Sequence, residues 1–297
     1  MCFAWEKTVT LNNKKNFSLL REAHMHGRIR RFFIIASLVF FAAPAAFCQQ
    51  VLKLSTTTST ENSGLLAYLF PSFEAKSGMK VQVISVGTGK ALELAKNGDV
   101  DVTLVHARPS EDKFVAEGYG VNRRDVMYND FILVGPPGDP AGVKTAGKDV
   151  LKGLKKIVDS HARFISRGDN SGTEQMEQAY WKQLGSKPTG SAYVSAGLGM
   201  GEVLNMASEL HAYTLTDRAT YLAYRAKTDL TIVLEGDPRM FNPYGIIAVN
   251  PARHPGINYK GAMQLIDWIT SREGQGKIAG FRIEGKQVFF PSANRAR

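Results

Sequence analysis

The chain has 297 residues, of which 44% are hydrophobic and 22% charged, and a formal net charge of +10. This length leaves room for two domains with sizeable cores. Residues 1–48 hold seven Lys/Arg and two Asp/Glu, which leaves 30 basic and 25 acidic residues, a net charge of +5, for the rest. So small a surplus, without a dense basic patch, argues against a nucleic-acid-binding protein.

The first 48 residues have the pattern of a secretory signal peptide. Arginines within 28–31 precede the apolar run 32–41, and small residues dominate 42–46. The apolar run is too short for a comfortable membrane span, so we expect export and cleavage near Cys48 and Gln49. Lipidation of Cys48 is an alternative, disfavoured because bulky Phe47 precedes it. Residues 1–24 are polar and are typical of a start placed too early, with Met25 as the true start.

Cysteine and histidine indicate neither a disulfide nor a metal site in the mature chain. Both cysteines, Cys2 and Cys48, lie in the leader, so we expect stability to come from the core. The mature histidines lack metal-ligand spacing, and we expect surface or capping roles for all of them: His106, His161, His211 and His254.

From residue 51 onward, short apolar runs alternate with helical patterns, which favours βα units on a largely parallel sheet. The predicted strands of this first part are 51–54, 79–86, 100–107 and 128–134. Helices are predicted after the first three strands: around Leu65 to Phe73, from Leu92 to a stop at Gly98, and around 114–116. A hydroxyl-rich turn, 55–60, and a glycine turn, 87–90, open the first two helices.

The segment 135–140 is rich in Gly and Pro and marks a first domain crossing. Beyond it we expect strands at 162–166 and 212–217, the second with Asp217 as a helix cap. A helix is predicted through Met176 and Tyr180 up to a stop at Gly185. Two more helices are predicted, one at 203–210 and one through Tyr221 and Tyr224. A strand at 242–249 returns the chain to the first domain, where a last helix runs through Met263 and Ile269. The sequence thus predicts an α/β fold with two lobes: residues 49–133 with 245–297, and residues 134–244.

The stretch Ser166–Thr173 has the strongest functional signal. It reads as a strand that turns on Gly168 and opens a helix, where free backbone N–H groups and the positive end of the helix dipole attract anions. Arg167 adds a guanidinium, whose planar fork of donors suits a tetrahedral oxyanion. The plainer alternative is that Asp169 or Ser171 only caps the helix. The hydroxyl-rich turn 55–60 argues for two halves of one site, and Thr88 is either a third contributor or a turn residue.

Several motifs in combination resemble the tungstate-binding periplasmic component of ABC transporters. They span about residues 51–291 and comprise Ser55–Thr60 with 63–66, Val86–Ala91, Arg167–Thr173, Ala212–Arg218 and Asn242–Gly245. The resemblance implies a two-lobed binding protein of type II, with two hinge crossings, that closes on one oxyanion and delivers it to a membrane permease. It implies no enzyme activity, no cofactor, no cation ligands and no stable membrane insertion after signal cleavage. The predicted anion-binding residues are Thr57, Thr58, Ser59, Thr88, Arg167, Ser171, Gly172 and Thr173. Glu174 departs from the pattern, because a histidine is expected after Thr173.

Other ligands and functions stay open at this point. Molybdate has nearly the same size, charge and shape as tungstate, and the Arg167–Thr173 motif also resembles phosphate receptors; sulfate would underfill the cavity. An exported hydrolase with Ser171 or Ser59 as nucleophile lacks a Gly-x-Ser-x-Gly elbow. A sensor that binds the ion only to signal would need a separate membrane partner.

Overall fold

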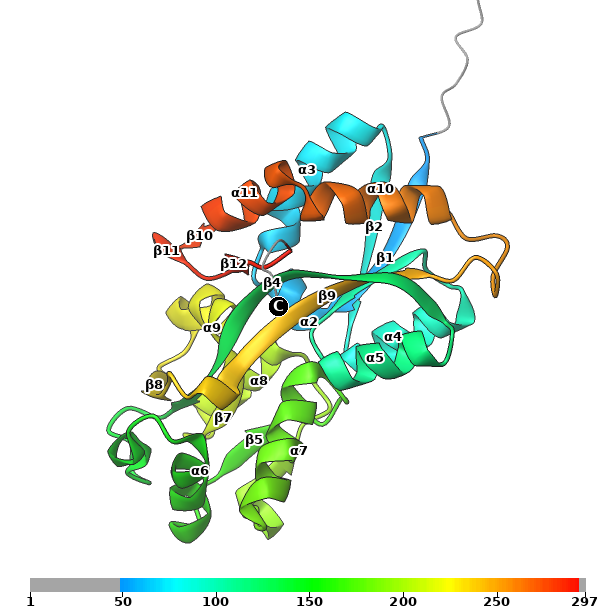
Figure 1. Cartoon of the computed structure of the whole chain (residues 1–297). Helices are drawn as coiled ribbons and strands as arrows, with labels where there is room; N and C mark the ends of the chain where they lie inside the picture. Colours follow the sequence, from blue (N-terminus) through cyan, green and yellow to red (C-terminus); the bar gives the residue numbers. More distant parts are fainter. Residues whose placement is uncertain (1–48, 294–297) are drawn as a thin grey trace, which may run out of the picture. The chain divides into compact units, whose positions relative to one another are not determined.

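The computed structural model describes residues 49–293 (Figure 1). The predicted signal peptide, the start at Met25 and the lipidation of Cys48 all lie outside these residues. The strands are Val51–Thr57 (β1), Lys80–Val86 (β2), Val102–Val105 (β3), Gly120–Gly135 (β4), Phe164–Ser166 (β5), Tyr193–Ser195 (β6), Thr214–Asp217 (β7), Thr231–Leu234 (β8), Phe241–Val249 (β9), Arg282–Ile283 (β10), Lys286–Gln287 (β11) and Phe290–Pro291 (β12).

The helices begin right after the first strand. They are Thr58–Asn62 (α2), Leu65–Ser77 (α3), Thr88–Asn97 (α4), Arg108–Ala116 (α5), Val150–Asp159 (α6), Gly172–Leu184 (α7), Met200–Glu209 (α8), Arg218–Tyr224 (α9), Tyr259–Thr270 (α10) and Arg272–Gly280 (α11). Short 3-10 helices lie at Val143–Ala146 (η1), Gly190–Ala192 (η2), Arg225–Lys227 (η3) and Pro238–Met240 (η4).

The main sheet has the strand order β12-β4-β9-β3-β1-β2, with β7 and β8 paired to β4. β1 is parallel to both β2 and β3, because the intervening helices α3 and α4 carry the chain back to the same edge. The pairs β3–β9, β4–β9 and β4–β7 are antiparallel. The expectation of a largely parallel sheet is therefore wrong for the half of the sheet built on β4 and β9.

β4 spans 16 residues, far more than the predicted strand at 128–134. Its first part pairs with β9, and its end pairs with β7 and β8. In Figure 1, β4 and β9 run side by side from the region of α10 to the region of β7. These two long strands therefore connect the elements near β1 with those near β7. Turns follow β4 directly, within the Gly- and Pro-rich segment 135–140 where a domain crossing is predicted.

Besides the short α2, which lies partly in the predicted turn 55–60, the sequence analysis missed α6 and α11. α6 begins at its N-cap Asp149, whose side chain accepts from the N–H groups of Leu151 and Lys152, and it buries Val150, Leu154 and Ile157 at helical spacing. α11 follows α10, which was expected to be the last helix, and starts at its N-cap Ser271. Strong apolar periodicity was present in α6, so its sequence signal was available.

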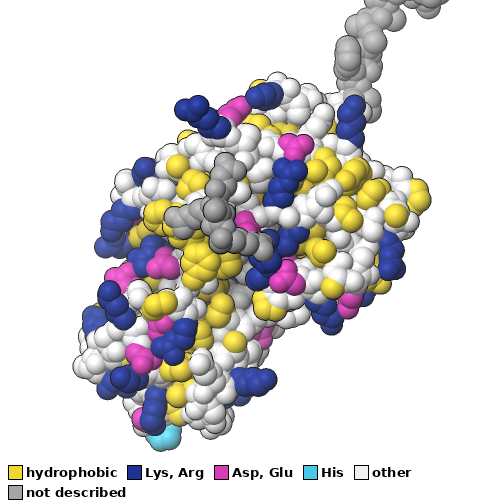
Figure 2. All heavy atoms as spheres, in the orientation of Figure 1, with side chains coloured by type: hydrophobic (Ala, Val, Ile, Leu, Met, Phe, Trp, Pro, Cys, Tyr) yellow, Lys and Arg dark blue, Asp and Glu magenta, His cyan; other side chains and the backbone are white. Residues whose placement is uncertain are grey.

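The surface of the described part matches the mild charge of the sequence. On the face shown in Figure 2, Lys and Arg side chains are interspersed with Asp and Glu and form no dense basic patch. Within residues 49–293, no helix combines the length and the apolar character that crossing a bilayer requires.

Candidate functional site

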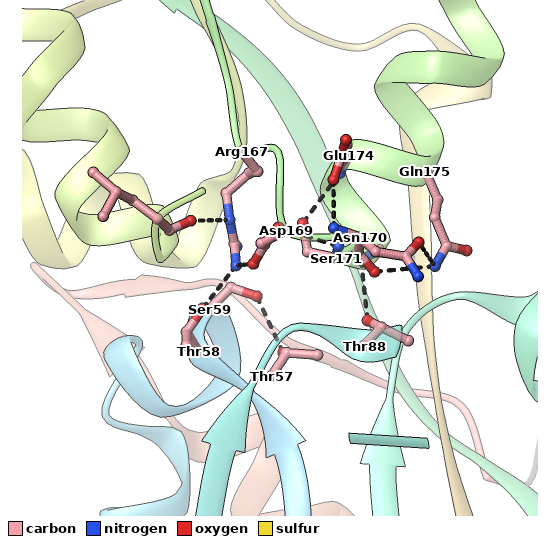
Figure 3. A network of polar contacts seen from close by, with 12 residues as sticks. Thr57, Thr58, Ser59, Thr88, Arg167, Asp169, Asn170, Ser171, Glu174 and Gln175 are labelled. Carbon is pink, nitrogen blue, oxygen red and sulfur yellow. Dashed lines mark hydrogen bonds and ion pairs between the residues drawn. The ribbon is translucent and has the colours of Figure 1, made fainter. Parts of the chain in front are cut away.

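Three loops that each lead from a strand into a helix meet in one place (Figure 3). They are the β1–α2, β2–α4 and β5–α7 loops. The Gly172 N–H donates to the Thr88 hydroxyl over 3.0 Å, and the Gly89 N–H donates to the Asn170 carbonyl over 3.2 Å. Arg167 Nη2 donates to the Thr58 hydroxyl over 3.0 Å. Loops far apart in the sequence therefore meet at the predicted residues.

Arg167 is the charged centre of this meeting point. Its side chain is 1% exposed, and its Nε donates to the Leu198 carbonyl over 3.0 Å. Nη2 binds Thr58 and forms an ion pair with Asp169. Nη1 has no hydrogen-bond partner within the described residues. Since buried donors are nearly always satisfied, this open N–H marks a position where an acceptor fits.

The Asp169 carboxylate folds back on its own loop. One oxygen pairs with Arg167, and the other accepts from the Ser171 N–H over 3.1 Å. This is the turn expected when an aspartate caps its own backbone. Both carboxylate oxygens therefore already accept a hydrogen bond.

The N-terminus of α7 supplies further donors. Ser171 is the N-cap, and its hydroxyl accepts from the Glu174 N–H over 3.3 Å. The Glu174 carboxylate accepts from the Asn170 N–H, so it turns back toward the loop that precedes the helix. Thr173 is fully buried, and its hydroxyl has no partner within the described part of the chain. The helix dipole and this open hydroxyl both favour a negative charge here.

The β1–α2 loop brings its own hydroxyls together. Thr57 is the N-cap of α2, and its Oγ1 accepts from the Thr60 N–H over 3.3 Å. The Thr57 and Ser59 hydroxyls lie 3.1 Å apart, and each lies 3.2 Å from Nε2 of His106. Of these residues, Thr58 is the one that contacts Arg167 directly.

His106 is a residue that sequence reasoning missed. It was expected at the surface or in a cap, but its side chain is buried beside the Thr57–Ser59 loop. Burial lowers the pKa of its imidazole from 6.5 to about 4; the hydrogen bond with Asn242 opposes this shift and the charge of Arg167 reinforces it. A signal was available, because His106 directly follows β3 and Thr57 ends its parallel neighbour β1, so both lie at one edge of the sheet.

A close approach of α7 to His106 explains why residue 172 is a glycine. A Cβ on this residue would lie 2.8 Å from the carbonyl oxygen of His106 and 2.9 Å from its Nδ1. The first residue of α7 can therefore pack against the end of β3 only as glycine. The predicted site residues thus all lie in or beside the three loops, with Gly172 at the contact between two of them.

The arrangement suits an anion that has no proton to give. Its donors are hydroxyls, backbone N–H groups and one guanidinium, and the Asp169 carboxylate beside this guanidinium is already engaged by Arg167 and Ser171. A charge spread over several oxygens can accept many directed bonds from such a set. Within residues 49–293, no group of three or more His, Cys, Asp or Glu side chains is placed to hold a metal ion.

Comparisons with known proteins identify the family of the chain. A family model described as a PBP superfamily domain matches residues 46–273. The tungstate-binding protein TupA of Peptoclostridium acidaminophilum is 49% identical over 243 residues, which are 81% of this chain and 85% of that protein.

Two solved structures are similar over most of their length. The tungstate ABC transporter from Geobacter sulfurreducens has 56% sequence identity and a TM-score of 0.72, covering 78% of this chain and 98% of that one. The tungstate-binding protein TupA from Desulfovibrio alaskensis has 44% identity and a TM-score of 0.70, covering 82% of this chain and 100% of that one. The predicted α/β periplasmic-binding-protein fold is confirmed, and the chain belongs to the PBP superfamily, in the family of the TupA proteins.

Proposed function

We propose that this protein is an extracytoplasmic solute-binding protein that captures tungstate for uptake by an ABC transporter. The relatives reported above are named as tungstate-binding proteins or as a tungstate ABC transporter, and the chain covers most of their length. A membrane permease is the partner that such a protein serves.

One observation in the site carries the proposal. Two donors that are almost fully buried, Nη1 of Arg167 and the hydroxyl of Thr173, have no partner in the part of the chain described. Leaving a buried donor unpaired costs about 1–3 kcal/mol, so both groups gain when an oxyanion accepts from them. The proposed contacts of the anion are Thr57, Thr58, Ser59, Thr88, Arg167, Ser171, Gly172 and Thr173. Within this set, Thr57 and Thr88 also hold the loops in place.

The site lies where we propose that two lobes meet. Residues 49–133 with 245–297 form one lobe and residues 134–244 the other, and β4 and β9 link them. The Arg167–Thr58 and Gly172–Thr88 hydrogen bonds join a loop of the second lobe to loops of the first. Closure of the lobes would then complete the donor set around the anion.

The hydrogen bonds that the Asp169 carboxylate already accepts favour tungstate or molybdate over phosphate as the ligand. Hydrogen phosphate keeps a proton and needs an acceptor, whereas tungstate and molybdate carry none at neutral pH. Both Asp169 oxygens already accept one hydrogen bond, so a phosphate proton would have to share a carboxylate that Arg167 and the Ser171 N–H engage, whereas tungstate needs no such acceptor. Tungstate and molybdate are too alike for these contacts to separate, so molybdate stays the alternative ligand.

The contact between Ser59 and His106 resembles the serine–histidine pair of a hydrolase and bears on that alternative. Three features oppose catalysis. Asn242, and not a carboxylate, faces Nδ1 of the histidine; Thr57 shares its Nε2; and burial lowers its pKa to about 4, too low for an efficient base at neutral pH. The similar proteins are also named for binding or transport. Binding is therefore the function that the site supports.

The proposed function also requires that the protein is exported from the cytoplasm. The leader 1–48 would direct the chain out of the cytoplasm and be removed near Cys48 and Gln49. This location follows from the sequence pattern together with similarity to periplasmic binding proteins, and mass spectrometry of the exported protein would give the new N-terminus.

A titration with four oxyanions tests the ligand. Residues 49–297 are melted and titrated calorimetrically with tungstate, molybdate, sulfate and phosphate. An anion at a hundred times its Kd adds about 2.7 kcal/mol to the free energy of unfolding, a shift of several degrees at this size. A response to tungstate at stoichiometric amounts, with little from sulfate or phosphate, supports the proposal. A response to phosphate alone moves the protein to the phosphate receptors, and ester hydrolysis without any anion response revives the hydrolase.

A further inference from the structure

We propose that His106 is a positioning residue of the anion site, which fixes the direction of the Thr57 and Ser59 hydroxyls by accepting a hydrogen bond at Nε2. The inference rests on the proposed function, because it assigns how that function's donors are arranged. It is built on a continuous series of buried polar contacts that runs from His106 through Asn242 and Asn129 to Asp217.

The hydrogen bonds in this series of polar contacts all run in one donor-to-acceptor order. Oδ1 of Asp217 accepts from the Thr220 N–H over 3.0 Å, so the Asn129 group that lies 3.2 Å from the same oxygen must be its NH₂. The Asn129 oxygen then faces Asn242, which donates its NH₂ over 2.6 Å. The Asn242 oxygen in turn faces Nδ1 of His106 at 3.0 Å. This order follows from an Asp217 Oδ1 that carries no proton; a proton held on Oδ2, beside the Thr220 hydroxyl, leaves the order unchanged although burial raises the pKa of this carboxyl.

This order assigns the tautomer of His106. An oxygen opposite Nδ1 requires a proton on Nδ1, and a neutral imidazole then has a lone pair on Nε2. Burial keeps the imidazole neutral near pH 7, since it lowers the pKa to about 4. Nε2 is therefore an acceptor that faces two hydroxyls, those of Thr57 and Ser59, at 3.2 Å each.

The acceptor at Nε2 determines which of the two hydroxyl hydrogens stays available to the anion. Thr57 Oγ1 accepts from the Thr60 N–H as the cap of α2. With the Thr60 hydroxyl, 2.7 Å away, as a second donor, both lone pairs of Thr57 Oγ1 are used and its own hydrogen is the one suited to Nε2. Ser59 then keeps its hydrogen for another acceptor. Without Nε2, the Thr57 hydrogen would turn to the Thr60 hydroxyl, 2.7 Å away, and the Ser59 hydrogen could turn to Thr57 Oγ1, 3.1 Å away, which would remove a donor from the anion. His106 thus keeps one neutral donor available without adding a positive charge.

The series of polar contacts is anchored in the two long strands. Asn129 of β4 and Asn242 of β9 are register partners, and Asp217 ends β7 and caps α9. All the side chains of this series are buried. The proton position of His106 is therefore set by the strands that link the two proposed lobes, and a loop that moves during closure does not disturb it.

Two substitutions separate positioning from packing. His106→Gln keeps an acceptor near Nε2 but loses the donor to Asn242, whereas His106→Asn keeps that donor and loses the acceptor. Both remove the buried ring, and asparagine leaves the larger void, so the melting temperature of each ligand-free variant is measured beside its affinity. We expect His106→Asn to weaken tungstate binding at least about tenfold and His106→Gln to recover most of that loss. Equal affinities in the two variants would overturn the proposal.

A spectroscopic measurement does not depend on the variants. Nitrogen NMR of the unmodified protein, labelled at histidine, distinguishes a protonated ring nitrogen from one with a lone pair. We expect Nδ1 of His106 to be protonated and Nε2 to be unprotonated near pH 7, and a proton on Nε2 would overturn the proposal. Failure of the unmodified protein to bind tungstate would instead count against the proposed function, and the variants would then be compared with whichever of the four oxyanions it binds.

Discussion

Replacing Thr173 by valine should weaken tungstate binding without destabilising the ligand-free protein. The Thr173 side chain is fully buried and its hydroxyl has no partner in the described residues, so valine removes no hydrogen bond from the free protein. With the anion bound, the lost bond has a charged acceptor and is worth about 1.5–3 kcal/mol. That range corresponds to a rise in Kd of about 10- to 150-fold.

Thr103 provides a matched control. It is also fully buried with an unpartnered hydroxyl, but it lies within β3, ahead of the strand end that reaches the site. Calorimetric titration with tungstate, in competition with a weaker anion where binding is tight, should give Thr103→Val a Kd within about twofold of the unmodified protein. Equal Kd values for the two variants would refute the assignment of Thr173. A loss of more than about 1 kcal/mol in the ligand-free Thr173→Val protein would mean that its hydroxyl has a partner after all.

Three further changes test other parts of the molecule. Arg167→Ala should raise the Kd for tungstate at least about 100-fold, since it removes a charged donor; near-normal affinity in the same titration would exclude its role. Gly172→Ala should lower both affinity and melting temperature, because its Cβ would lie 2.8 Å from the His106 carbonyl; unchanged values would mean that the loops shift at no cost. Burial raises the pKa of Glu177 from 4.5 to about 7, so the folded state holds this proton more tightly than the unfolded state and loses stability as the pH rises through that window. Glu177→Gln has no such proton to lose. Measured by denaturant unfolding, its stability relative to the unmodified protein should therefore rise by up to about 3 kcal/mol between pH 5 and pH 8. A difference in stability that does not change with pH would contradict the assigned pKa.

Much of the site could be predicted because its signals are local. The hydroxyls of Thr57 and Ser171 cap the helices that follow them, and a capping residue acts on N–H groups two or three positions further along the chain. The Asp169 turn and the Asp217 cap are local in the same way, and both agree with expectation. Alternation of apolar runs with helical patterns likewise identifies the α/β class, since each pattern reports the burial of its own segment.

Only the tertiary structure decided how strands pair and which polar atoms are left without partners. A strand such as β4 reads the same beside a parallel or an antiparallel neighbour, so its length and its pairing with β9 were not visible in the sequence. His106 looked like an ordinary polar residue until burial placed it against Thr57 and, through Asn242, against the long strands. The open donors on Arg167 and Thr173 depend on every atom around them, because satisfaction of a hydrogen bond is a property of the packed environment, whereas a cap or a turn is a property of neighbouring residues.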